Sequence, residues 1–161
     1  MPRIDRAVAD VAASPAAVYA TFVDPDALAS WLPPDGMHGE LSEPRLREGG
    51  GFTMTLRYAE GAGRGKTTPD TDVTHVVIDE LVVGARVVWG IEFESDDPAH
   101  AGRMTMTWTF TPHEGGTRVA VDVTDVPPGI DADAHQQGLD ASLAHLAAHV
   151  SPDAPPVGGS A

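Results

Sequence analysis

The stretch MTMTWTF, from Met104 to Phe110, alternates large apolar side chains with threonine without interruption. In an extended chain successive side chains point to opposite faces of a sheet, so this pattern predicts a strand with one apolar face. The same period of two recurs in three neighbouring runs, at residues 73–81, 85–95 and 117–126. Short turns separate all of these runs, which favours antiparallel neighbours. The chain is therefore expected to build an antiparallel sheet.

Two further strands and a first, imperfect one are predicted earlier in the chain. Residues 38–58 read as two strands joined by a glycine turn at residues 49–51. Residues 3–11 alternate less regularly, with Asp5 on the same side as Ala7 and Ala9. The sequence therefore predicts seven strands: the imperfect first strand at residues 3–11, and six more between residues 38 and 126.

Helical spacing interrupts the strands in two places. Ser14 followed by Pro15 is a typical helix start, whereas Asp24 with Pro25 ends that helix and opens a second short one that finishes near Trp31. A long amphipathic helix ends the ordered chain, and its apolar stripe is made by Leu139, Leu143, Leu146 and Val150.

The order strand, two short helices, six strands and one long helix can bury its apolar faces only if a curved antiparallel sheet wraps the last helix. The predicted fold class is therefore α+β, with one domain over residues 1–150. Residues 151–161 have too little apolar content to order themselves, so we expect a disordered tail.

Composition narrows the classes of partner. Ten Lys and Arg against 24 Asp and Glu give a net charge of −14, which disfavours nucleic acid and anionic membranes. The chain has no cysteine, which excludes thiol nucleophiles and thiolate metal sites. No apolar run approaches the roughly 20 residues of a membrane span, and the first residues lack a signal-peptide core. We therefore expect a soluble cytoplasmic protein.

Four motifs carry a family resemblance: SPAAVYATFVDPDALASWL, the GGGF turn before a strand, GGTRVAV, and GLDASLAHLAAHV at the end. Their order and spacing, over residues 3–150, resemble the START-like SRPBCC superfamily and, within it, the branch similar to the activator of heat-shock protein 90 ATPase. The resemblance implies a helix-grip fold, in which a seven-stranded sheet surrounds the C-terminal helix and leaves an apolar cavity. Members include ligand carriers, polyketide cyclases and relatives of a co-chaperone domain, so the fold alone does not select a function.

The inward apolar face is the best candidate for a binding site. Flexible methionines suit a surface that adapts to a guest, and pockets are mostly apolar with a few polar groups, here a tyrosine hydroxyl and two indole N–H groups. For any single one of these residues the ordinary core is the favoured interpretation, and it is as a set that they form the candidate site. The candidate ligand-binding residues are Phe52, Met54, Tyr58, Trp89, Met104, Met106, Trp108, Leu139 and Leu143.

Other motifs are interpreted as structural. GAGRGKT, residues 61–67, lacks the first glycine of a phosphate-binding loop and leads into a strand, so we interpret it as a hairpin loop. His145 and His149 have metal-chelating spacing but no further ligands, and are expected at the solvated flank of the helix. Glu92 and Glu94 are expected to face solvent. We assign no catalytic residue, metal or cofactor.

Three functions remain open. The leading hypothesis is a non-enzymatic module that binds a small hydrophobic molecule between the sheet and the last helix. The second is an enzyme of the cyclase or hydrolase kind, which needs a buried ionisable group facing the cavity; His75 is the nominee, although alternation favours an outward side chain. The third is a co-chaperone-like partner of heat-shock protein 90. The sequence does not indicate the oligomeric state.

Overall fold

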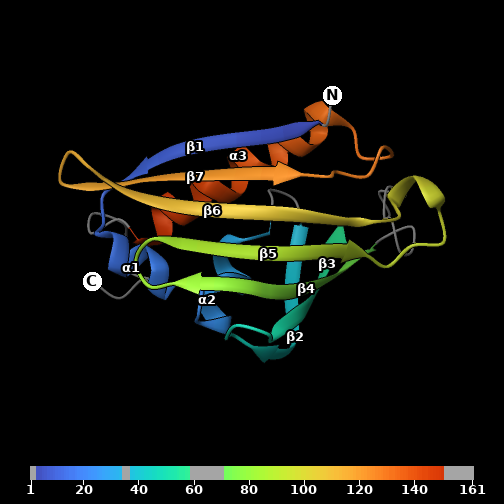
Figure 1. Cartoon of the computed structure of the whole chain (residues 1–161), viewed down its shortest axis with the longest axis horizontal. Helices are drawn as coiled ribbons and strands as arrows, with labels where there is room; N and C mark the ends of the chain where they lie inside the picture. The colour runs from blue at the N-terminus through green and yellow to red at the C-terminus, as the bar shows by residue number, and fades with distance from the viewer. Residues whose placement is uncertain (1–2, 34–36, 59–70, 151–161) are drawn as a thin grey trace.

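The computed structural model describes residues 3–33, 37–58 and 71–150, with the side chain of Tyr58 excepted. These residues form seven strands, three α-helices and one short 3-10 helix (Figure 1). The strands are β1 (Ile4–Val11), β2 (Met37–Arg45), β3 (Gly51–Tyr58), β4 (Thr71–Val82), β5 (Arg86–Phe93), β6 (Arg103–His113) and β7 (Gly116–Thr124). The helices are α1 (Pro15–Ala20), α2 (Pro25–Trp31), η1 (Pro98–His100) and α3 (Ala132–Val150).

All seven strands belong to one sheet, in the order β1-β7-β6-β5-β4-β3-β2, and every neighbouring pair is antiparallel. In Figure 1 the strands β1, β7, β6, β5 and β4 run side by side, whereas β3 and β2 turn steeply away, so the sheet is strongly curved. Helix α3 lies behind β1, β7 and β6 in this view and packs against β1. The predicted α+β class and the predicted sheet around a C-terminal helix are confirmed.

The two short helices begin where their sequences predict. The Oγ atom of Ser14 accepts a hydrogen bond from the Ala17 amide at 3.2 Å, and Pro15 occupies the first turn of α1. The Oδ1 atom of Asp24 accepts from the Asp26 amide at 3.0 Å and starts α2 in the same way. Helix α2 then packs against α3 and β2, which places Trp31 in the interior.

One turn is shorter than the sequence pattern predicts. The predicted runs that end at Phe110 and begin at Thr117 leave residues 111–116 for the turn, but β6 continues to His113, which pairs with Gly116. The connection is two residues, Glu114 and Gly115, with φ of 48° and 82°. Two consecutive positive φ angles match the twist of an antiparallel hairpin, so the strands stay paired up to a tight turn.

Alternation along the strands separates an inner face from an outer one. On β6 the residues Met104, Met106, Trp108 and Phe110 are buried, while the intervening threonines are only partly so. On α3 the buried residues are Leu139, Ser142, Leu143 and Leu146. These two faces meet in a single hydrophobic core that also takes in Val18, Phe22 and Leu28 from the region of α1 and α2.

Two parts of the chain singled out in the sequence fall outside the described residues: the hairpin loop at residues 61–67 and the tail at residues 151–161. Among the helices that are described, none combines the length and the apolar character needed to cross a membrane.

Candidate functional site

The candidate binding residues predicted from sequence lie together on the inner side of the fold. Eight of them belong to the one buried cluster: Phe52, Met54, Trp89, Met104, Met106, Trp108, Leu139 and Leu143. The ninth, Tyr58, ends β3, and its side chain lies outside the described part of the structure. The sheet and the helix therefore bring these eight residues into one region.

An aromatic cluster occupies the centre of this region. The Phe22 ring lies between the inner face of the sheet and α2, with its centroid 4.9 Å from that of Trp31 and 5.1 Å from that of Trp108. Trp108 in turn lies 5.5 Å from both Trp31 and Trp89, between ring centroids. Offset and edge-to-face contacts at these distances stabilise aromatic groups beyond the burial of their surface.

Phe22 and Trp31 were missing from the candidate set derived from sequence. Trp31 is the last residue of α2 and Phe22 lies just after the end of α1, and helical spacing alone predicted only a helix face at both places. Each is fully buried. In the sequence, a large aromatic residue at the end of a short helix was the only indication that these residues are buried. The packing of α2 against α3 shows where the Trp31 ring lies.

The three tryptophans share an unusual feature. Their indole N–H groups, on Trp31, Trp89 and Trp108, are buried and have no hydrogen-bond partner in the described structure. Buried polar groups are nearly always paired, and an unpaired buried donor costs about 1–3 kcal/mol. These three donors therefore need a hydrogen-bond acceptor that the described interior does not give them.

Few other polar groups reach the interior. Among the described residues the buried ionisable side chains are Asp5 and Asp72, at 8% and 4% exposure. Asp72 shares the inward register of β4 with Thr74 and Val76. The Thr74 hydroxyl donates to the Met54 carbonyl at 3.4 Å, and the Ser142 hydroxyl to the Leu32 carbonyl at 2.6 Å.

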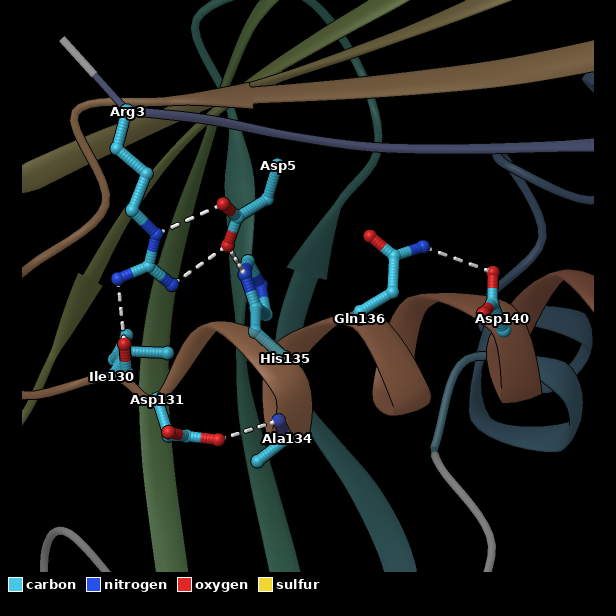
Figure 2. A network of polar contacts seen from close by, with 8 residues as sticks. All are labelled: Arg3, Asp5, Ile130, Asp131, Ala134, His135, Gln136 and Asp140. Atoms are coloured by element: carbon cyan, nitrogen blue, oxygen red, sulfur yellow. Dashed lines mark hydrogen bonds and ion pairs between the residues drawn. The ribbon is translucent and has the colours of Figure 1, made fainter. Parts of the chain in front are cut away.

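Asp5 is the centre of a network that joins β1 to the first turn of α3 (Figure 2). Arg3 donates to both carboxylate oxygens of Asp5, at 2.9 and 2.8 Å, and to the Ile130 carbonyl at 2.7 Å. The Nδ1 atom of His135 lies 2.5 Å from Asp5 Oδ2. Asp131 starts the helix beside them by accepting from the Ala134 amide at 2.8 Å.

These contacts control the charge of Asp5. The hydrogen bonds from Arg3, and after them the contact with His135, lower the pKa of Asp5 from its usual 3.8 to about 2, against the opposing effect of burial. Asp5 is therefore ionised over the whole physiological range. Sequence reasoning placed Asp5 beside Ala7 but assigned it no role, because its partner lies 130 positions away.

His75 faces outward, as alternation favoured. Its ring nitrogens lie 3.2 Å from Thr53 Oγ1 and 3.1 Å from Glu94 Oε1, in an exposed cluster on the outer face of the sheet. Glu92 and Glu94 are exposed, which confirms the expectation for them. His75 therefore does not supply the inward-facing ionisable group that the enzyme hypothesis required.

The expectation for the two histidines of α3 holds for only one of them. His149 is exposed, but His145 is half-buried and its Nδ1 atom lies 3.0 Å from the Pro33 carbonyl oxygen. Because the end of α2 packs against α3, the His145 side chain connects α3 to the chain just after α2. Helical spacing alone does not show this contact. No group of three His, Asp or Glu side chains in the described ranges is arranged to hold a metal ion.

Solved structures resemble this fold over nearly its whole length. The protein CV1439 from Chromobacterium violaceum has a TM-score of 0.82 and 31% sequence identity, and the match covers 95% of this chain and 100% of that one. The AHSA1 (SPO3351) protein from Silicibacter pomeroyi has a TM-score of 0.73 at 20% identity, with 92% and 97% of the two chains covered.

A third structure is DynU16, a protein of the dynemicin biosynthetic locus. It has a TM-score of 0.65 at 22% identity, and the match covers 94% of this chain but 48% of that one. At this identity the likeness shows the shared fold. None of the curated proteins compared with the chain matches it.

The family comparison agrees with the structural one. The model of the family described as "Activator of Hsp90 ATPase homolog 1-like protein" matches residues 12–151, which takes in every element from α1 to α3. With the seven-stranded sheet and the C-terminal helix, this match shows that the chain belongs to the family of Activator of Hsp90 ATPase homolog 1-like proteins.

Proposed function

We propose that the protein binds a small hydrophobic molecule between the inner face of the sheet and α3. The observation that carries the proposal is the set of three buried indole N–H groups without a described acceptor, in an interior otherwise lined by apolar side chains. The indole rings contribute packing volume, but packing by itself gains nothing from their N–H groups, and each buried donor without an acceptor is unfavourable. A bound molecule that carries an acceptor satisfies at least one of them.

The alternative partner for these donors is the face of a neighbouring ring. Trp31 and Trp108 meet edge-to-face at 86°, as do Phe52 and Trp89. Contacts between N–H groups and rings are weak compared with a hydrogen bond to oxygen. They therefore compensate a buried donor only in part, and a ligand oxygen still gains free energy by displacing them.

The inner face also contains side chains that can rearrange around a guest. Met54 on β3 and Met104 and Met106 on β6 are buried on the inner face, and Met106 pairs with Trp89 across β5 and β6. Methionine is unbranched and adopts several conformations at low cost. These residues allow the interior to open without disturbing the hydrogen bonds of the sheet.

The first test compares native and denaturing mass spectra of the purified protein and analyses any released molecule. We expect an apolar compound that leaves on denaturation. A matched pair of variants on α3 then locates it: Leu143→Phe adds bulk inside, whereas Ala148→Phe adds the same ring on the exposed side. Leu143→Phe should abolish retention and Ala148→Phe should not. Equal retention by both variants would place the ligand elsewhere and refute the proposed site.

The two other hypotheses have less support. The enzyme hypothesis loses its nominated residue because His75 is exposed. The co-chaperone hypothesis rests on the description of the family. It predicts that the protein raises the ATPase rate of a heat-shock protein 90, and an unchanged rate together with no complex would exclude it. A cytoplasmic setting, without nucleic acid or membrane as partner, is part of our proposal on the basis of the charge of −14.

A further inference from the structure

We infer that the ligand is a neutral apolar molecule with a carbonyl oxygen, which accepts a hydrogen bond from at least one of the buried indole N–H groups. This inference rests on the proposed function and specifies its ligand class. Three properties of the described interior carry it: the donor character of the polar groups in the aromatic cluster, the negative sign of the buried charges, and the occupation of two inner carbonyl groups by hydroxyl donors.

The polar groups of the aromatic cluster are all donors. An indole N–H donates and cannot accept, and all three of these groups are buried without a partner among the described residues. Trp108 contacts both Trp31 and Trp89, with 5.5 Å between ring centroids, so the donors belong to one cluster and not to separate parts of the core. A ligand complementary to this cluster must carry an acceptor.

The charges around the interior disfavour an anionic acceptor. The buried ionisable side chains of the described ranges are both aspartates, Asp5 and Asp72. Arg3 approaches the interior, but its guanidinium is already bound to Asp5 and to the Ile130 carbonyl. A buried carboxylate on the ligand would lack a cation in this part of the structure, and unpaired buried charge is strongly unfavourable.

Other described arginines are held on the outer face of the sheet by acidic partners. They form the pairs Arg6 with Asp122 at 2.6 Å, Arg103 with Asp79 at 2.6 Å, and Arg118 with Asp10 at 2.8 Å. These side chains are exposed, so they point away from the aromatic cluster. The net charge of −14 also repels an approaching anion. A neutral ligand avoids both penalties.

Among neutral acceptors, a carbonyl group fits better than a hydroxyl group. A hydroxyl brings a donor of its own, which would need an acceptor inside. Two carbonyl groups of the described interior already accept a hydroxyl, that of Met54 from Thr74 and that of Leu32 from Ser142. A ketone, quinone or amide carbonyl satisfies an indole without this requirement.

The test uses three probes with one ring skeleton: fluorenone, fluorene and fluorenecarboxylate. The protein has three tryptophans, so a ¹⁵N-correlated spectrum gives three indole N–H signals, each an independent reporter. We expect fluorenone to bind about tenfold more tightly than fluorene, as one hydrogen bond to an unsatisfied donor implies. Fluorenone alone should move at least one indole proton signal downfield. Fluorenecarboxylate should bind more weakly than fluorenone.

A substitution separates the hydrogen bond from the packing of the ring. Replacing the tryptophan whose signal moves by benzothienylalanine removes the N–H group and keeps the shape. The preference for fluorenone over fluorene should disappear, while fluorene binding stays the same. Retention of the preference would overturn the inference.

The other outcomes are also decisive. Equal binding of fluorenone and fluorene with unmoved indole signals would refute the carbonyl and leave the hydrophobic site intact. Tightest binding of fluorenecarboxylate would refute the neutral class. Binding of none of the probes, with no small molecule released from the purified protein, would refute the proposed function and this inference with it.

Discussion

Replacing Asp5 by asparagine tests the network that fastens β1 to α3. The substitution keeps the size of the side chain but removes the charge to which Arg3 donates twice, at 2.9 and 2.8 Å. It also weakens the contact with His135 at 2.5 Å. Because Asp5 is only 8% exposed, solvent screens these interactions weakly.

The magnitude follows from the pKa of Asp5, which lies at about 2 in the folded protein against 3.8 ordinarily. Each pKa unit corresponds to about 1.4 kcal/mol, so the ionised carboxylate contributes roughly 2 kcal/mol to the free energy of unfolding at neutral pH. The folded pKa is the lower one, so this contribution is complete above pH 4 and is lost as the pH falls towards 2. About half of it should remain near pH 3.

Urea unfolding followed by tryptophan fluorescence measures the effect at several pH values from 7 to 2.5. We expect Asp5→Asn to destabilise the protein by roughly 2 kcal/mol at pH 7 and by clearly less at pH 2.5. Asp10→Asn is the control. Asp10 lies on the same strand as Asp5, but it is exposed and pairs with Arg118 of β7, and exposed ion pairs contribute little to stability. A difference between wild type and Asp5→Asn that stays constant with pH would refute the reasoning.

Three further substitutions test the packing of the core and two contacts between elements. Phe22→Ala should cost about 3–5 kcal/mol in urea unfolding, because Phe22 is fully buried among four aromatic rings; a loss below about 1 kcal/mol would contradict the aromatic cluster. Ser142→Ala should cost about 1 kcal/mol by leaving the Leu32 carbonyl without its donor at 2.6 Å, whereas the exposed Ser30→Ala should be neutral in the same assay. Gly90→Ala would place a Cβ atom 2.0 Å from Arg103 Nη2, so the flexible arginine should move off Asp79 at a cost below about 1 kcal/mol. That cost should vanish in an Asp79→Asn background, and additive effects of the two changes would argue against the contact.

Local patterns in the sequence predicted most of the secondary structure. Ser14 with Pro15 and Asp24 with Pro25 predicted two helix starts that the structure confirms through side-chain hydrogen bonds. Strict alternation in Met104–Phe110 predicted the inner face of β6. Where the pattern misled, at residues 111–116, the tight turn left the strands paired for longer than turn-forming residues suggested.

These patterns could not predict contacts between segments that are distant in the sequence. The environment of Trp31 depends on how α2 packs against α3, and that of His145 on the same contact. Ser142 illustrates the difficulty, since it lies among the alanines and leucines of α3 and yet binds the Leu32 carbonyl 110 positions earlier. The residues next to Ser142 and those next to Leu32 give no sign that these two groups bind each other.

By itself the sequence determined the strands, the helices and the inward residues of the candidate site, because side-chain periodicity follows from local backbone geometry. Its motifs also indicated the family that the comparisons show. Only the tertiary structure decided that three indole N–H groups are buried in one cluster without a described acceptor, and that Asp5 meets His135. Those outcomes depend on the curvature and register of seven strands and on where the last helix crosses them, which no local stretch of the chain specifies.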